Sequence, residues 1–253
     1  MNKILNILLL GALTSVTLMA DFTRVEMGAG VWSSKASGST SYVSGATSGE
    51  DISTENSESN PYLWVLIKHP IPVLPNLRLE YADTTNKGTA SGTFADFTTT
   101  ANTTTQLDFT QYDIIPYYNI LDNTPWVTLD IGLDIKLIDT KLRADNVTPT
   151  VGGGTTYSES ILLPIPLLYT RVRFEIPTTD IGLEADAKFI SYSDSTVYDV
   201  RIKIDYTLDF IPVIQPAVEV GYRKQKYKID EADLDGKIDL GFSGIYVGAM
   251  LRF

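Results

Sequence analysis

Cysteine is absent from the 253-residue sequence, and histidine occurs once, as His69. Without cysteine the chain has no disulfide framework, no thiolate metal site and no cysteine to carry a lipid anchor. Beyond position 20 there is no run of about 18 apolar residues, so we expect no transmembrane helix there. Beyond that point, the chain can cross a membrane only with strands.

Positive charge is also scarce. Lys and Arg total 20 against 31 Asp and Glu, and the formal net charge is −11. Such an acidic chain repels polyanions, which argues against a nucleic-acid partner. The length suits one or two ordinary domains, or a single all-β barrel.

Residues 1–20 have the organisation of a signal peptide. Lys3 provides a short positive region, an apolar stretch follows, and the small residue Ala20 precedes Asp21. A retained anchor helix is the poorer interpretation, because the segment is short and alternation begins directly after it. We therefore predict an exported protein whose single domain comprises residues 21–253.

Apolar and polar residues alternate in many segments of the mature chain, whereas helical periodicity is hard to find. Within residues 200–208, Ile202 and Ile204 share one face, and Arg201 and Lys203 share the other. Successive side chains of a strand point to opposite faces, so each segment has an apolar and a charged face. Ten such segments are predicted as strands, near residues 22–33, 60–69, 76–85, 106–119, 126–141, 158–176, 181–192, 196–209, 216–229 and 238–253.

The connections between these segments alternate in length. Four are short and mostly contain proline: 69–75, 121–125, 177–180 and 210–216. The others, most of them long and rich in small polar residues, are 34–59, 86–105, 142–157, 193–195 and 230–237. Short turns at one end and longer loops at the other are typical of outer-membrane barrels. We predict an all-β fold, a transmembrane antiparallel up-and-down β-barrel of about ten strands, with eight or twelve as alternatives.

Proline otherwise lies at the ends of the predicted strands, where its missing N–H breaks no ladder bond. Pro164 and Pro166 are the exception, because they fall inside the segment 158–176. We expect a bulge or a kink at this point.

Alternation alone does not say which face is inside. A secreted lipocalin-like barrel with an apolar interior is the alternative, and Gly30-Val31-Trp32 provides the Gly-x-Trp found near the start of lipocalins. Ten strands exceed the eight of a lipocalin, however. Aromatic residues also gather near strand ends, as in membrane girdles. Those expected near the short turns are Tyr117, Tyr118, Trp126, Phe174, Tyr206 and Phe210, and those expected near the loops are Trp64, Phe109, Phe189 and Tyr222.

The C-terminal segment alternates to its last residue. Ile245, Val247, Ala249, Leu251 and Phe253 fall on one face. The segment resembles the terminal strand that the outer-membrane assembly machinery recognises. We therefore expect that machinery as a partner through Phe253, together with outer-membrane lipids and lipopolysaccharide, and we expect a monomer.

With the apolar faces outward, the charged residues must share a narrow lumen. Ten acids and ten bases fall on the polar faces: Arg24, Glu26, Arg78, Glu80, Asp130, Asp134, Lys136, Arg171, Arg173, Glu175, Glu184, Asp186, Lys188, Asp199, Arg201, Lys203, Asp205, Glu219, Arg223 and Arg252. An isolated buried charge costs several kcal/mol, and pairing offsets that cost. The balance predicts a salt-bridged plug, and a thin solute pathway is the alternative.

The sequence offers little evidence for a catalytic site. A general base must lie within hydrogen-bond reach of its substrate, and His69 falls in a short turn, away from the long loops. Residues 231–236 place acids and glycine as in a calcium loop, but position twelve is Phe242 and no flanking helices are expected. We predict an acidic surface loop here, and no catalytic, cofactor-binding or metal-ligating residues.

Three segments carry a resemblance to a known family. They are VEMGAGVW at 25–32, HPIPVLPNLR at 69–78 and the closing residues 234–253. The chain is similar to an uncharacterised outer-membrane β-barrel family of proteobacteria along its whole mature length. The resemblance implies a signal peptide, a barrel and outer-membrane residence, and it transfers no site residues. The expected function is therefore a non-enzymatic outer-membrane protein, with a narrow channel or a secreted ligand-binding barrel as alternatives.

Overall fold

The computed structural model describes part of the chain. The described residues are 23–42, 49–51, 58–71, 73–94, 97–124, 126–145, 148–149, 156–208, 214–231 and 236–253. The predicted signal peptide, Phe210 and most of the acidic segment 231–236 lie outside them. Among the described residues, no helix is long and apolar enough to cross a membrane.

Strands account for most of the described chain. They are β1 (Arg24–Tyr42), β2 (Gly49–Asp51), β3 (Glu58–Lys68), β4 (Asn76–Phe94), β5 (Phe97–Thr124), β6 (Val127–Asp145), β7 (Thr148–Pro149), β8 (Thr156–Glu175), β9 (Ile181–Tyr192), β10 (Ser195–Thr207), β11 (Gln215–Glu231) and β12 (Gly236–Arg252).

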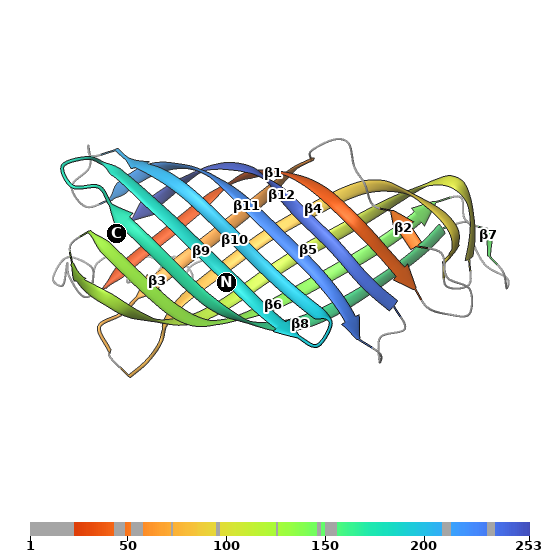
Figure 1. Cartoon of the computed structure of the whole chain (residues 1–253). Coiled ribbons are helices and arrows are strands. Elements are labelled where there is room, and N and C mark those ends of the chain that lie inside the picture. Colours follow the sequence, from red (N-terminus) through yellow and green to blue (C-terminus); the bar gives the residue numbers. More distant parts are fainter. Residues whose placement is uncertain are drawn as a thin grey trace, which may run out of the picture.

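The ten long strands close into an antiparallel barrel (Figure 1). In the described part of the chain, each long strand pairs with the next one along the sequence, and β12 pairs with β1 from Glu26↔Arg252 to Tyr42↔Gly236. The short strands β2 and β7 add to β1 and β5. The predicted ten-stranded up-and-down barrel is confirmed.

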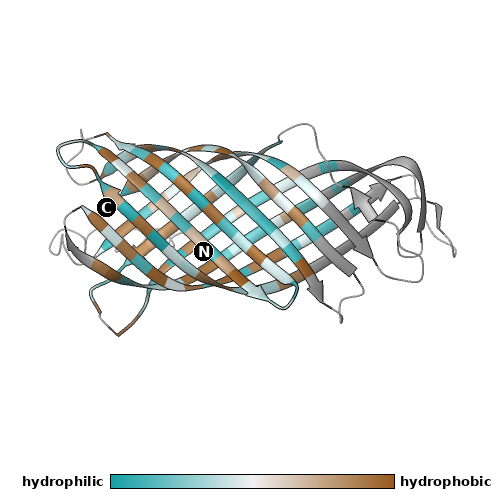
Figure 2. Ribbon diagram, in the orientation of Figure 1, coloured by the Kyte–Doolittle hydropathy of each residue, from teal (hydrophilic) through white to brown (hydrophobic). Residues whose placement is uncertain are grey.

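The barrel turns its apolar side chains outward. Ile202 and Leu133 are each 60% exposed, whereas Arg201 is 4% exposed and Asp130 is fully buried. Figure 2 shows the resulting alternation of hydrophobic and hydrophilic residues along the strands. This is the arrangement that a lipid-facing wall requires. It is opposite to the one that a lipocalin-like barrel needs.

The aromatic girdles are smaller than the sequence suggests. The described outward members are Tyr118, Trp126, Phe174 and Tyr206 near the short turns, with Phe189 and Tyr222 farther along the strands. The prediction is wrong for Trp64, Phe109 and Tyr117, which are buried in the lumen. On β3, the inward positions between Glu58 and Lys68 carry no charge, so alternation did not mark Trp64 as inward.

The longer loops predicted from composition are partly strands. Segment 86–105 is a correction, because β4 and β5 pair up to Phe94↔Phe97 through most of it. Its threonines are β-branched and favour extended backbone, so polarity alone does not end the ladder. β1, β6 and β8 likewise extend into the segments 34–59 and 142–157.

Pro164 and Pro166 cause no bulge. They stay in unbroken register with Leu137 and Ile135 of β6. The described pairing of β8 with β9 begins only at Leu168, so the missing N–H groups break no described bond on that side. The expectation of a bulge is therefore wrong, and the shorter β9–β10 hairpin leaves this part of β8 unpaired on the β9 side.

The strands of the barrel differ in length. A tilted strand needs about 9–11 residues to span a membrane. β9 and β10, with 12 and 13 residues, are close to this length, whereas β5 has 28. The long strands therefore continue past a membrane at the end opposite the short turns (Figure 1).

A cation at the centre of the outer wall should destabilise the barrel. Ile202→Lys near the middle of β10 is expected to cost about 2–4 kcal/mol in free energy of unfolding, because the ammonium must be buried in hydrocarbon. Reversible guanidinium unfolding in lipid vesicles measures this cost. Ile202→Leu is the control, and equal stability of the two variants would contradict the lipid-facing assignment.

Candidate functional site: the charged lumen

The inward positions of the ten strands hold a dense set of charges. Among the described residues, ten acids and nine bases are buried: Glu26, Glu80, Asp113, Asp130, Asp134, Glu184, Asp186, Asp199, Asp205, Glu219, Arg78, Lys136, Arg171, Arg173, Lys188, Arg201, Lys203, Arg223 and Arg252. Arg24 and Glu175 are half-exposed at the turn end and interact with each other at 3.8 Å. All twenty charges predicted to face the lumen are thus placed in it or at its rim.

Asp113 is a lumen acid that the sequence did not reveal. Its inward neighbours Gln111 and Ile115 carry no charge, and the outward residues Tyr112 and Ile114 are apolar. The polar face of β5 is therefore indistinct in the sequence. The partners of β5 could have revealed it, because Asp113 lies opposite Lys136 in the register.

Trp64 lies at the centre of a group of polar contacts inside the barrel. Its indole N–H donates to Glu219 at 3.1 Å, and the Tyr62 hydroxyl donates to the same carboxylate oxygen at 2.6 Å. The Lys203 ammonium lies 4.4 Å from the ring centroid and the Arg78 guanidinium 5.1 Å. Cations over an indole face are attracted by its quadrupole. Trp64 thus helps to solvate lumen charges.

Glycine at position 28 makes room for this indole. A Cβ atom there would lie 2.4 Å from the indole nitrogen of Trp64. At position 248, a Cβ atom would lie 2.2 Å from the hydroxyl oxygen of Tyr62. These glycines let β1 and β12 approach the aromatic side chains of β3.

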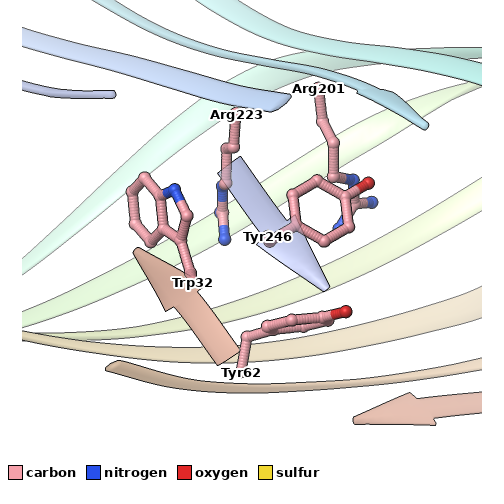
Figure 3. Close-up of a pocket in the computed structure, with 5 residues that line it drawn as sticks. All are labelled: Trp32, Tyr62, Arg201, Arg223 and Tyr246. Carbon is pink, nitrogen blue, oxygen red and sulfur yellow. The ribbon is translucent and has the colours of Figure 1, made fainter. Parts of the chain in front are cut away.

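A small pocket lies beside these residues in the lumen (Figure 3). It is lined by Trp32, Tyr62, Arg201, Arg223 and Tyr246, and its volume is about 10 Å³. This is close to the space that one water molecule needs. The buried Tyr246 hydroxyl has no hydrogen-bond partner among the described residues. A single water is therefore the occupant that fits.

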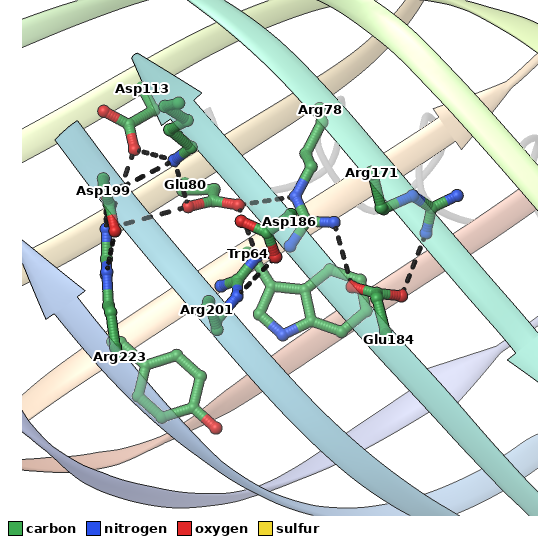
Figure 4. A network of polar contacts seen from close by, with 12 residues as sticks. Trp64, Arg78, Glu80, Asp113, Arg171, Glu184, Asp186, Asp199, Arg201 and Arg223 are labelled. Carbon is green, nitrogen blue, oxygen red and sulfur yellow. Dashed lines mark hydrogen bonds and ion pairs between the residues drawn. The ribbon is translucent and has the colours of Figure 1, made fainter.

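Two lysines and three acids meet in the middle of the lumen, and Figure 4 labels the acids Glu80, Asp113 and Asp199. The Lys188 ammonium lies 2.7 Å from Glu80 and also contacts Asp113. Lys136 lies 2.6 Å from Asp113 and 3.3 Å from Asp199. These side chains come from β4, β5, β6, β9 and β10 and join opposite walls of the barrel.

A second cluster lies toward the turn end. Arg173 forms a bidentate pair with Asp205, at 2.6 and 3.0 Å. Glu184 accepts hydrogen bonds from Arg171 at 3.1 Å and from Arg78 at 3.4 Å. Bidentate arginine–carboxylate pairs have the strongest geometry available to protein ion pairs.

Arg78 and Arg201 connect the two clusters. Arg78 lies 2.5 Å from Glu80, and Arg201 lies 2.9 Å from the same carboxylate. Arg201 also contacts Asp186 at 2.8 Å. Because Arg78 contacts Glu184 as well, ion pairs run without a break from one cluster to the other.

A layer of amide and aromatic side chains lies next to the network toward the loop end. Gln111 and Gln225 exchange hydrogen bonds of 3.0 and 2.7 Å, and Tyr227 donates to Gln111 at 2.9 Å. The Phe109 ring lies 5.0 Å from Tyr227 and 5.1 Å from Phe242, between centroids. The lumen is therefore ionic in its middle and aromatic above.

Asp134 differs from the other lumen acids. Its side chain is fully buried, and neither carboxylate oxygen has a hydrogen-bond partner within the described part of the chain. The buried acids also exceed the buried bases by one among the described residues. The neighbouring Lys136 and Lys188 donate instead to Asp113, Asp199 and Glu80.

His69 occupies a turn. Its Nε2 lies 3.0 Å from the Pro75 carbonyl oxygen, in the connection between β3 and β4. The described residues contain no group of three His, Cys, Asp or Glu side chains suited to a metal ion.

Comparison with known proteins identifies the fold. No protein-family model and no curated relative matches the sequence. The outer-membrane protease OmpT of Escherichia coli aligns with a TM-score of 0.55 at 11% identity, over 92% of this chain and 96% of OmpT. Ail of Yersinia pestis aligns with a TM-score of 0.34 at 11% identity, over 92% of this chain and 99% of Ail. The OmpT alignment shows the outer-membrane β-barrel fold, and at this identity it shows the fold alone.

Removing one lumen cation should lower the free energy of unfolding more than removing a surface cation. Lys188→Met leaves Glu80 and Asp113 short of a partner, so we expect a loss of about 3–5 kcal/mol in free energy of unfolding. Denaturant titration of the refolded barrel measures it. Lys141→Met, at an exposed position of β6, is the matched control. Similar losses in both variants would contradict the buried network.

Substitution of Asp134 should not lower the free energy of unfolding. Asp134→Asn removes a surplus charge without breaking a described hydrogen bond, so we expect stability to stay unchanged or to rise. Asp199→Asn is the control, because Asp199 accepts from Arg223 at 2.6 and 3.0 Å. Asp199→Asn is expected to lower the free energy of unfolding by about 1.5–3 kcal/mol. A larger loss at Asp134 than at Asp199 would refute the assignment.

Proposed function

We propose that the protein is a non-enzymatic integral outer-membrane barrel that its own ion pairs keep closed. The observation that carries the proposal is the unbroken set of cross-lumen contacts, in which Glu80 of β4 meets Lys188 of β9 and Arg201 of β10. In this reading the barrel is an anchor. It holds the extended strands of the loop end outside the cell.

The outward apolar wall supports residence in the outer membrane. A soluble protein would expose such a band to water over most of its circumference, which the hydrophobic effect opposes. The proposed partners are outer-membrane lipids, lipopolysaccharide and the assembly machinery, which would bind the C-terminal strand ending at Phe253. The barrel closes through β12 and β1, so no second copy is needed to complete it. Membership of an uncharacterised proteobacterial barrel family is part of the same proposal.

The packing of the lumen supports closure. A solute larger than water must displace several charged side chains at once, and each would then be buried without its partner. The pocket beside Tyr62 and Tyr246 has space for about one water molecule. Thermal opening of this network is therefore expected to be rare.

The position of the single histidine supports a non-catalytic role. His69 lies at the turn end, and its ring contacts the backbone of its own connection. Among the described lumen acids, all except Asp134 are paired with a lysine or an arginine. The geometry that the described residues offer is suited to stability.

Planar bilayer recordings test the closed lumen. We expect no stable single-channel steps from the refolded protein. The comparison variant is Arg173→Ala with Asp205→Ala, which removes a buried pair without changing net charge and should admit ions. Heat-modifiable gel migration verifies that both proteins are folded. Stable conductance steps from the unaltered protein would establish the narrow channel instead.

A further inference from the structure

The connection between β3 and β4 exposes apolar side chains where a periplasmic turn would normally be polar. Val73 is 81% exposed, and Ile71 and Leu74 are each 52% exposed. Figure 1 shows this connection projecting sideways from the wall at the turn end, rather than along the barrel axis. The three side chains therefore form a small apolar tip beside the barrel.

The turn is held in this shape by His69. The Ile71 N–H donates to His69 Nδ1 at 3.2 Å. The proton of the neutral ring then lies on Nε2, which donates to the Pro75 carbonyl at 3.0 Å. Asn76 accepts the His69 backbone N–H at 3.0 Å. These bonds satisfy backbone groups of the turn, and its apolar side chains remain half-exposed or more.

Tyr118 fastens the turn to the outer wall. Its hydroxyl donates to the Val73 carbonyl oxygen at 3.0 Å. Tyr118 is an outward residue of β5, and it belongs to the girdle that also contains Trp126, Phe174 and Tyr206. Aromatic girdles lie at the level of the lipid headgroups. The apolar tip is thus placed beside the membrane interface.

We propose that Ile71, Val73 and Leu74 form an interfacial anchor that inserts into the lipid leaflet on the turn side. The inference rests on the proposed membrane residence. Lipid is the occupant because the tip continues the lipid-facing surface through Tyr118, so no gap separates it from the bilayer. Apolar side chains at the boundary between headgroups and acyl chains bind the membrane in proportion to the area they bury.

Single-cysteine labelling tests the anchor, because the natural sequence contains no cysteine to interfere. Val73→Cys, Thr178→Cys and Ile202→Cys are labelled with a polarity-sensitive fluorophore and refolded into phospholipid vesicles. Thr178 lies in the exposed connection between β8 and β9 and is the aqueous control. Ile202 lies on the outer wall and is the lipid control. Quenching is measured with nitroxide-labelled phospholipid and with aqueous iodide.

The proposal expects several-fold stronger lipid quenching at position 73 than at position 178, and weaker iodide quenching. If quenching at position 73 matches the aqueous control while position 202 is quenched by lipid, the interfacial anchor in the β3–β4 connection is overturned and membrane residence is not. Absence of lipid quenching at 202 would instead overturn membrane residence. Shielding of 73 in native outer membranes but not in vesicles would assign the tip to a protein partner and also overturn the proposal.

Discussion

Charges in a narrow lumen must find partners, and this constraint shapes the interior of the barrel. A carboxylate or ammonium without a partner costs several kcal/mol when it leaves water. Inward charges therefore meet across the lumen, as Glu80 on β4 meets Arg201 on β10 at 2.9 Å. Such contacts tie opposite walls together. The ion pairs that offset the desolvation of the lumen charges therefore also connect distant strands of the barrel.

The aromatic residues follow from the same constraint. Trp64 and Tyr62 lie inside because Glu219 needs donors, and both of them donate to it. The indole face also contacts Lys203 at 4.4 Å, so one side chain serves an acid and a base. Small residues such as Gly28 make this approach possible. The same contacts therefore pair the lumen charges and place aromatic side chains among them.

Alternation was sufficient to predict the barrel, because the period of two is a property of every strand. It placed Ile202 and Arg201 on opposite faces, and the strand number, the aromatic residues and the C-terminal strand then favoured the apolar face outward, as the structure shows. It failed where both faces look alike, so Tyr117 and Phe109 were assigned to the wrong side and Asp113 was overlooked. It failed again at the threonine-rich segment 86–105, because a polar composition resembles a loop when the partner strand is unknown.

The sequence by itself determined the apolar and charged faces of about ten strands and the near balance of charge on the polar faces, since each depends on residue type and local spacing. Only the tertiary structure decided the pairing partners. Lys188 contacts Glu80 and Asp113 because the register and closure of the barrel bring β9 close to β4 and β5. Closure likewise decided which acid, Asp134, has no described partner. Contacts between distant strands depend on the stagger of the whole sheet, which no local pattern encodes.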